Sequence, residues 1–152
     1  WQARTKAAGR SIHEPGPNVI MGANAQVAIE KFARYWDIEA RLVPVDESTN
    51  YVMSPERAME YCDENTIGVF VILGSTYTGS YENVERMDEL LTEYEKKTGT
   101  YIPIHVDGAS GGFVAPFAHP KVKCDFRIPR VVSMNTSGHK FGLAYVGVGW
   151  VI

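Results

Sequence analysis

The sequence predicts an α/β fold built on a doubly wound, mostly parallel sheet. Short apolar runs alternate with amphipathic stretches along the chain, which is the pattern of strands layered with helices. One run, Ile67–Leu73 (IGVFVIL), is apolar throughout, as in a strand covered on both faces. The 152 residues, 45% hydrophobic and 22% charged, have the size and composition of one globular domain.

Helix caps and apolar spacing predict the elements of the first half. Gly9 is a helix stop, Asn24 can cap a helix, and Ser54 before Pro55 is a good helix start. The predicted elements are a helix over 1–9, a strand Asn18–Met21, a helix from Asn24 to Tyr35, a strand Ala40–Val45 and a helix from Ser54 to Glu64. In the second helix, helical spacing predicts a core face of Ala25, Ala28, Ile29, Phe32 and Trp36.

The second half, after the apolar run, predicts one long helix and three more strands. The helix spans Tyr81–Lys97, with two lysines at its end and Gly99 as its stop. The strands are expected at Tyr101–Val106, Arg130–Asn135 and Tyr145–Ile152. Repeated strand, helix, strand order favours parallel pairing of most strands.

Charge, cysteine content and hydropathy exclude several classes of function. Fifteen Lys and Arg oppose 18 Asp and Glu, so no basic surplus exists for nucleic acid. No apolar run approaches the roughly 18–20 residues of a membrane span, and the first residues lack the apolar core of a signal peptide. Two distant cysteines without a CxxC motif fit a reducing compartment. We therefore expect a cytoplasmic protein without nucleic-acid or membrane partners, and the abrupt ends suggest a piece of a longer one.

Three strand exits carry polar groups among small residues. Leu73 is followed by GSTYTGSYE, Val106 by DGASGGF and Asn135 by TSGHKFG. Ligands of doubly wound sheets bind beyond the carboxyl ends of the strands. Small residues there let a ligand approach the backbone closely. The exits therefore predict where the functional site lies.

Lys140 and Asp107 are the sharpest candidates for chemistry. A lysine surrounded by apolar strands is desolvated, and desolvation favours the neutral amine that forms a Schiff base. By residue type alone, a solvated surface lysine is the commoner case. A partly buried carboxylate at a strand end is stabilised by a positive partner, and a protonated pyridine nitrogen is one such partner. The alternative is a purely structural Asp107 that caps the next turn.

Other polar residues support several interpretations. His105 and Asp107 form an H-x-D pair on one strand face, and with His139 or His119 they can make a metal site of a hydrolase. Ser137 and His139 suit a phosphate, or simply a polar turn. Thr76 and Thr78 can donate to a ligand or to their own backbone, and Gln26 can lie against a ring or in solvent.

Long motifs resemble the glutamate decarboxylases, a family of group II pyridoxal-phosphate-dependent decarboxylases. The resemblance rests on HVDGASGGFVAPF (105–117), DFRIPRV (125–131) and SGHKFG (137–142). It extends through KFARYWDIE (31–39), YVMSPERAME (51–60), DENTIGV (63–69) and GSTYTGSYE (74–82). Departures are few: Gly108 stands where alanine is usual, and Ile72 where bacterial members have threonine.

The resemblance implies a pyridoxal 5'-phosphate site in part of the large domain of a fold-type I enzyme. Lys140 matches the lysine that holds the cofactor as a Schiff base, and Asp107 matches the acid that pairs with the pyridine nitrogen. The remaining implied cofactor contacts are Gln26 stacked on the ring, Ala109 under its opposite face, Thr76 beside it, and Ser137 and His139 on the phosphate.

The same resemblance implies a reaction and partners. The expected activity is decarboxylation of L-glutamate to 4-aminobutyrate and carbon dioxide by a homo-oligomer, a dimer or a multiple of dimers. It places a further phosphate-binding segment before Trp1 and a small domain after Ile152, so residues 1–152 alone are expected to be inactive. Calmodulin is an expected partner only through a tail beyond this sequence, as in plant members. A non-catalytic interaction module and a metal-dependent hydrolase remain the alternatives.

Overall fold

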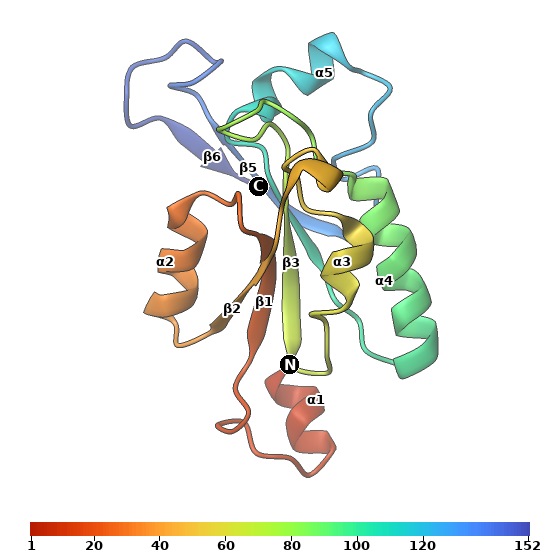
Figure 1. Cartoon of the computed structure of the whole chain (residues 1–152). Helices are drawn as coiled ribbons and strands as arrows, with labels where there is room; N and C mark the ends of the chain where they lie inside the picture. Colours follow the sequence, from red (N-terminus) through yellow and green to blue (C-terminus); the bar gives the residue numbers. More distant parts are fainter.

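The computed structural model describes residues 1–152 and contains one six-stranded sheet. Its strands are β1 (Asn18–Gly22), β2 (Glu39–Val43), β3 (Thr66–Ile72), β4 (Ile104–Asp107), β5 (Val131–Ser137) and β6 (Gly149–Val151). The spatial order is β2-β1-β3-β4-β5-β6 (Figure 1). All neighbours pair in parallel except β6, which is antiparallel to β5. The predicted mostly parallel α/β sheet is confirmed.

Helices lie on both faces of this sheet. The helices of the chain are α1 (Gln2–Ala7), α2 (Val27–Tyr35), α3 (Pro55–Met59), α4 (Val84–Thr98) and α5 (Ala115–Ala118), with short 3-10 turns η1 (Glu47–Thr49) and η2 (Gly111–Phe113), and α2, α3 and α4 are the ones that flank the strands (Figure 1). Figure 1 shows α2 on one side of the strands, and α3 beside α4 on the other. A core cluster of 17 buried residues includes side chains of α3, α4 and the sheet, and a second cluster of six includes those of α2. This is the doubly wound arrangement.

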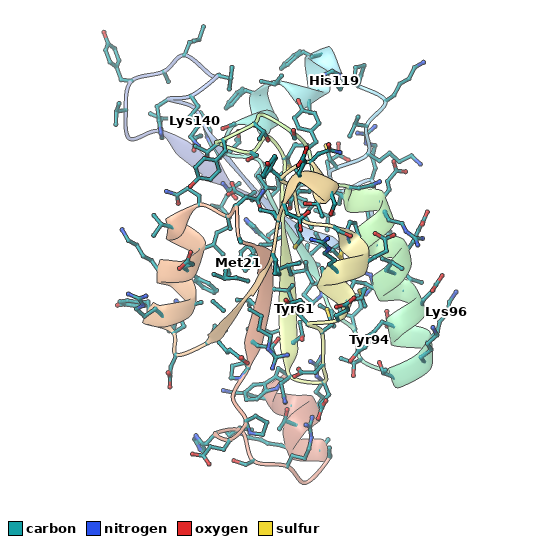
Figure 2. The ribbon with its side chains drawn as sticks, viewed as in Figure 1. Met21, Tyr61, Tyr94, Lys96, His119 and Lys140 are labelled. Atoms are coloured by element: carbon teal, nitrogen blue, oxygen red, sulfur yellow. The ribbon has the colours of Figure 1, made fainter.

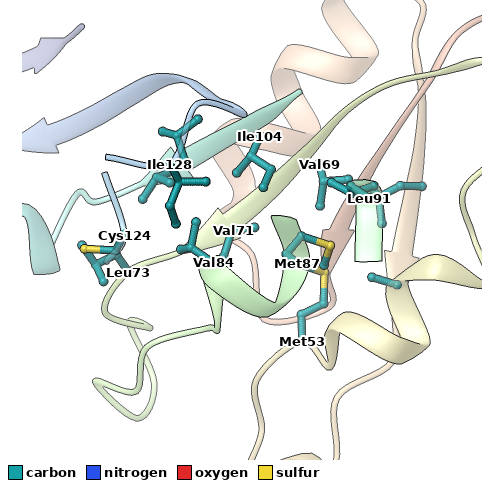
Figure 3. Packing of buried hydrophobic residues seen from close by; sticks show 14 of the residues in the cluster. Met53, Val69, Val71, Leu73, Val84, Met87, Leu91, Ile104, Cys124 and Ile128 are labelled. Atoms are coloured by element: carbon teal, nitrogen blue, oxygen red, sulfur yellow. The ribbon is translucent and has the colours of Figure 1, made fainter. Parts of the chain in front are cut away.

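The long helix α4 illustrates how caps fix an element. It begins at Val84 rather than at the predicted Tyr81, because the Asn83 side chain accepts a hydrogen bond from the Arg86 backbone N–H at 3.0 Å. Its end is as predicted, with Gly99 in the left-handed conformation at φ 74°. Met87 and Leu91 of α4 are fully buried in the larger core cluster (Figure 3).

The predicted cap of α2 is wrong. Asn24 is buried and donates from Nδ2 to the Glu82 carboxylate at 3.1 Å, so it does not cap a helix. Gln26 takes that role, because its Oε1 accepts from the Ala28 backbone N–H. The chain must turn between β1 and α2, which delays the helix by two residues and puts Gln26 at its N-terminus.

The predicted core face of α2 is only partly right. Ile29 is buried as expected, but Phe32 and Trp36 are 41% and 64% exposed. Ala33 is buried in their place, and Ala28 faces solvent. Helical spacing identifies neighbouring positions, but it does not tell which side of a broad apolar stripe meets the sheet.

The remaining boundaries differ at segment ends. The helix α3 ends at Met59 rather than Glu64, and the next turn is tied to the sheet. There, the Asp63 carboxylate accepts from Asn18 Nδ2 at 2.9 Å and from the Asn65 backbone N–H at 2.8 Å. The final strand is only three residues long. No helix here has both the length and the apolar character that crossing a bilayer requires.

A buried carboxylate joins three segments beneath the strand exits. Glu82 is 3% exposed and accepts from the backbone N–H groups of Ile72 (2.7 Å) and Met53 (2.9 Å) as well as from Asn24. Desolvation raises the pKa of the Glu82 carboxyl, and these hydrogen bonds offset the rise only in part. The group therefore links β3 to the loops after β1 and before α3.

The raised pKa of Glu82 predicts a pH effect on stability. The folded protein binds this proton more tightly than the unfolded chain, whose carboxyl has a pKa of about 4.3. The stabilisation is therefore complete below that value and is lost as pH rises through the raised pKa. In Glu82→Gln, the thermal unfolding midpoint should fall less steeply with pH in this window than in the wild type. The exposed Glu60→Gln is the control; equal slopes for wild type and Glu82→Gln would contradict the prediction.

Candidate active site

The carboxyl ends of β4 and β5 open into a cleft beside the N-terminus of α2. Its volume is about 460 Å³. Six of the seven residues predicted as cofactor contacts line it, namely Gln26, Asp107, Ala109, Ser137, His139 and Lys140. The parallel topology thus gathers residues that are more than 100 positions apart in the sequence, as Gln26 and Lys140 are.

Asp107 lies at the last position of β4 and is 8% exposed. Its Oδ1 accepts from the Ala109 backbone N–H at 3.1 Å and from Asn135 Nδ2 at 2.9 Å. Its Oδ2 has no hydrogen-bond partner in the chain, and Asp107 takes part in none of the ion pairs. A buried carboxylate with one free oxygen beside a cleft is suited to a cationic ligand.

Lys140 lies in the loop between β5 and β6. It is half-buried, and its ammonium makes no hydrogen bond or ion pair within the chain. It lines both the cleft and a neighbouring cavity of about 320 Å³. Figure 2 shows it at the end of the molecule that also carries His119. The lysine is therefore free to react with a ligand held in either space.

Thr76 is not brought into the main cleft. It is exposed and lines the neighbouring cavity, which the loop after β3 and the turn after β4 enclose. It shares that cavity with Lys140, so only the lysine connects it to the other predicted residues. The family resemblance implied Thr76 as a cofactor contact, and that role stays a prediction, with Thr76 in the cavity next to the cleft.

Gln26 and Ala109 lie on different elements of the cleft wall. The Gln26 carboxamide is exposed, with its oxygen engaged at the start of α2 and its NH2 group free. Ala109 follows β4, and its carbonyl accepts from the Ser137 backbone N–H at 3.1 Å. That bond ties the exit of β4 to the exit of β5, and so holds two walls of the cleft together.

Ser137 and His139 supply the polar end of the cleft. Ser137 is the last residue of β5, and no hydrogen bond occupies its hydroxyl. His139 is exposed, and its Nδ1 lies 3.1 Å from the Val148 carbonyl oxygen. A carbonyl only accepts, so Nδ1 carries the proton and Nε2 remains available to a ligand.

Close backbone packing explains the glycines of the turn after β4. A Cβ at Gly111 would collide with the Leu73 carbonyl oxygen. At Gly108 it would lie 2.8 Å from Met134 Cε and 2.9 Å from the Asn135 carbonyl oxygen. Gly108, which stands where the family usually has alanine, therefore suits this backbone, because an added methyl group would be crowded here.

The H-x-D pair of His105 and Asp107 does not form a metal site in this structure. His105 Nδ1 lies 2.7 Å from Ser133 Oγ, and Nε2 lies 2.7 Å from Asn135 Oδ1. His119 instead packs edge-on against the Tyr81 ring. No group of three or more His, Cys, Asp or Glu side chains is placed to hold a metal ion. Both nitrogens of His105 are engaged by neutral side chains, which removes the ligand that the hydrolase alternative needs.

Asn135 and Ser133 belong to this site, although the sequence motifs did not point to them. Both lie on β5 opposite the H-x-D pair, with Asp107 beside Asn135 and His105 beside Ser133 in the strand register. The alternation of side chains along a strand places residues 133, 135 and 137 on one face. That spacing was visible in the sequence, but the register that sets these residues against His105 and Asp107 was not.

Comparisons with known proteins agree on one family. Residues 1–152 match the family described as "Pyridoxal-dependent decarboxylase conserved domain". The whole chain is 53% identical to a glutamate decarboxylase of Petunia hybrida, and 51% identical over 164 aligned positions to one of Saccharomyces cerevisiae. It spans 30% and 28% of those two proteins.

Solved structures give the same result. The glutamate decarboxylase of Lactobacillus brevis is 44% identical and superposes with a TM-score of 0.94, over 99% of this chain and 34% of its own length. These matches confirm the family that the sequence motifs indicated, and they confirm the pyridoxal cofactor that the family implies. Because the family match covers every residue, the chain belongs to the pyridoxal-dependent decarboxylase family.

Proposed function

We propose that the full-length protein decarboxylates L-glutamate to 4-aminobutyrate and carbon dioxide with pyridoxal 5'-phosphate, and that residues 1–152 form part of its large domain. The observation that carries this proposal is the cleft that gathers Lys140, Asp107, Ser137 and His139 in a chain so similar to glutamate decarboxylases. The relatives support the substrate class, and the residues of the cleft support the assignment of the cofactor contacts.

The residues of the cleft fit the cofactor's chemical groups. The free Oδ2 of Asp107 suits a protonated ring nitrogen, because it is a buried acceptor without a cation of its own. The unpaired Lys140 amine suits the aldehyde carbon. The Ser137 hydroxyl and His139 Nε2 suit phosphate oxygens, and the free NH2 group of Gln26 leaves that side chain able to lie against a ring.

Each side chain has a separable task in the proposed reaction. When bound, pyridoxal phosphate supplies a ring that withdraws the electron pair left by the departing carboxylate. Asp107 Oδ2 holds a proton on the ring nitrogen through a charged hydrogen bond. Lys140 Nζ would hold the cofactor at its aldehyde carbon. Ser137 and His139 would hold the phosphate, and so orient the ring toward Asp107.

The proposal extends to assembly and location. The loop after Lys140 carries Leu143, Tyr145 and Val146, each at least 90% exposed. Such apolar exposure beside a cleft supports a homo-oligomer in which this loop is covered. Both cysteines are free, which supports a reducing cytoplasmic location.

The test compares the full-length protein with residues 1–152 alone. Purified full-length protein with added cofactor should release carbon dioxide from L-glutamate, and far less from L-aspartate or an aromatic amino acid. The fragment should not turn over, because it spans 30% of the Petunia relative's length and leaves its Tyr145–Ile152 edge exposed. Release from the fragment within about tenfold of the full-length rate, which is about 1.4 kcal/mol in barrier, would contradict this prediction. A full-length protein that prefers another amino acid would overturn the proposed substrate.

A further inference from the structure

Four polar side chains form a hydrogen-bonded row across β4 and β5, on the sheet face that lines the cleft. Ser133 Oγ lies 2.7 Å from His105 Nδ1, and His105 Nε2 lies 2.7 Å from Asn135 Oδ1. Asn135 Nδ2 donates to Asp107 Oδ1 at 2.9 Å. The strand register pairs His105 with Ser133 and Asp107 with Asn135, so the row passes from one strand to the other at each step.

The chemistry of its members gives this row a direction. An ionised Asp107 only accepts hydrogen bonds, so the Asn135 amide must present its NH2 group to it. The Asn135 oxygen then faces His105 and must accept, which places a proton on His105 Nε2. In the neutral imidazole, Nδ1 is left to accept from the Ser133 hydroxyl. Turning the amide over would set its oxygen against a carboxylate oxygen.

The row fixes the orientation of Asp107. Asn135 and the Ala109 backbone N–H both donate to Oδ1, and together they leave Oδ2 as the free oxygen. His105 is held in turn by Phe70 on β3, whose ring centroid lies 5.2 Å from that of the imidazole at an angle of 58°. Neither His105 nor Asn135 takes part in an ion pair. Both side chains therefore orient the Asp107 carboxylate through hydrogen bonds and bring no further charge to the cleft.

We propose that Asn135 and His105 are positioning residues that aim the Asp107 carboxylate at the cofactor's ring nitrogen, with His105 acting through its Nε2–H donor. This inference rests on the proposed function and deepens it. It assigns the histidine of the H-x-D pair a task for which neither a metal nor a direct contact with the ring is required. Ser133 selects the tautomer by donating to the opposite ring nitrogen.

Two variants of one residue separate this role from simple packing. In His105→Gln, the amide nitrogen can reach the position of Nε2 and still donate to Asn135. In His105→Asn, the shorter amide reaches only the position of Nδ1, so the donor to Asn135 is lost. Both are made in the full-length protein. The measurements are the dissociation constant of pyridoxal phosphate, the 15N shift of labelled cofactor at its ring nitrogen, and kcat and KM for L-glutamate.

The expected results differ in direction between the two variants. His105→Asn should weaken cofactor binding by roughly 10- to 100-fold, the size of effect seen when outer partners of ligating residues are removed. Its ring nitrogen should lose protonation, and kcat should fall with KM little changed. His105→Gln should stay within about threefold of the wild type on all of these measures. Equal losses in both variants, or no loss in either, would overturn the proposal.

A measurement on the unmodified protein keeps the inference testable if a variant fails to fold. Histidine 15N shifts of the full-length protein without cofactor should show His105 protonated at Nε2 and bare at Nδ1; the opposite tautomer would overturn the row. Failure of the proposed function looks different. In that case the wild type would not bind pyridoxal phosphate, or Asp107→Asn would bind it as well as the wild type, whatever the tautomer of His105.

Discussion

Replacing Lys140 with alanine in the full-length protein is expected to abolish turnover and the covalent attachment of the cofactor together. The lysine lies in a loop, makes no hydrogen bond through its ammonium and is only half-buried, so its removal should leave the fold intact. The loss should exceed a thousandfold, because the nucleophile itself is gone. Two quantities are measured: turnover, and the absorbance of the cofactor that stays attached to the protein after borohydride reduction.

Lys121→Ala is the matched control for this variant. Lys121 is exposed and has no ion-pair partner, so it tests the loss of a surface lysine alone. It should match the wild type in turnover and in attached cofactor. A Lys140→Ala protein that still retains a borohydride-stable adduct would show that another lysine is the anchor.

Asp107→Asn should reduce turnover by roughly a thousandfold or more, equivalent to about 4 kcal/mol in the barrier. The asparagine oxygen can keep the hydrogen bonds from Ala109 and Asn135, which puts its NH2 group where Oδ2 was. That group donates to an unprotonated ring nitrogen, so the charge that stabilises the protonated ring is lost. Cofactor binding should therefore weaken less than turnover.

The control for this variant is Asp37→Asn. Asp37 is exposed and adopts a positive φ of 54°, which asparagine tolerates, so this change removes one carboxylate without strain. It should leave turnover unchanged. If Asp107→Asn retains near-normal turnover, Asp107 does not hold the ring proton.

The sequence predicted those parts of the fold that local chemistry determines. Gly99 and its flanking lysines ended α4 as expected, and the apolar run before Leu73 became a central parallel strand. The cleft residues Asp107, Ser137 and Lys140 were found because each lies at or just after the end of a strand, and parallel strands end at one edge of a sheet.

The parts that failed depend on partners far away in the sequence. Asn24 is a good capping residue, yet the buried Glu82 carboxylate from another loop engages it instead. The helical spacing of Phe32 and Trp36 does not reveal which side of the apolar stripe of α2 meets the sheet. His105 suggested a metal ligand, and only the register of β4 against β5 shows that Ser133 and Asn135 occupy its nitrogens.

The site at which the cofactor attaches is the most direct test of the proposed function. Full-length protein incubated with pyridoxal phosphate should be reduced with borohydride, digested and mapped by mass spectrometry. We expect a single pyridoxyl adduct on the peptide that contains SGHKFG, with the added mass on Lys140. An adduct on a different lysine, or an unmodified Lys140 in protein that turns over glutamate, would contradict this expectation.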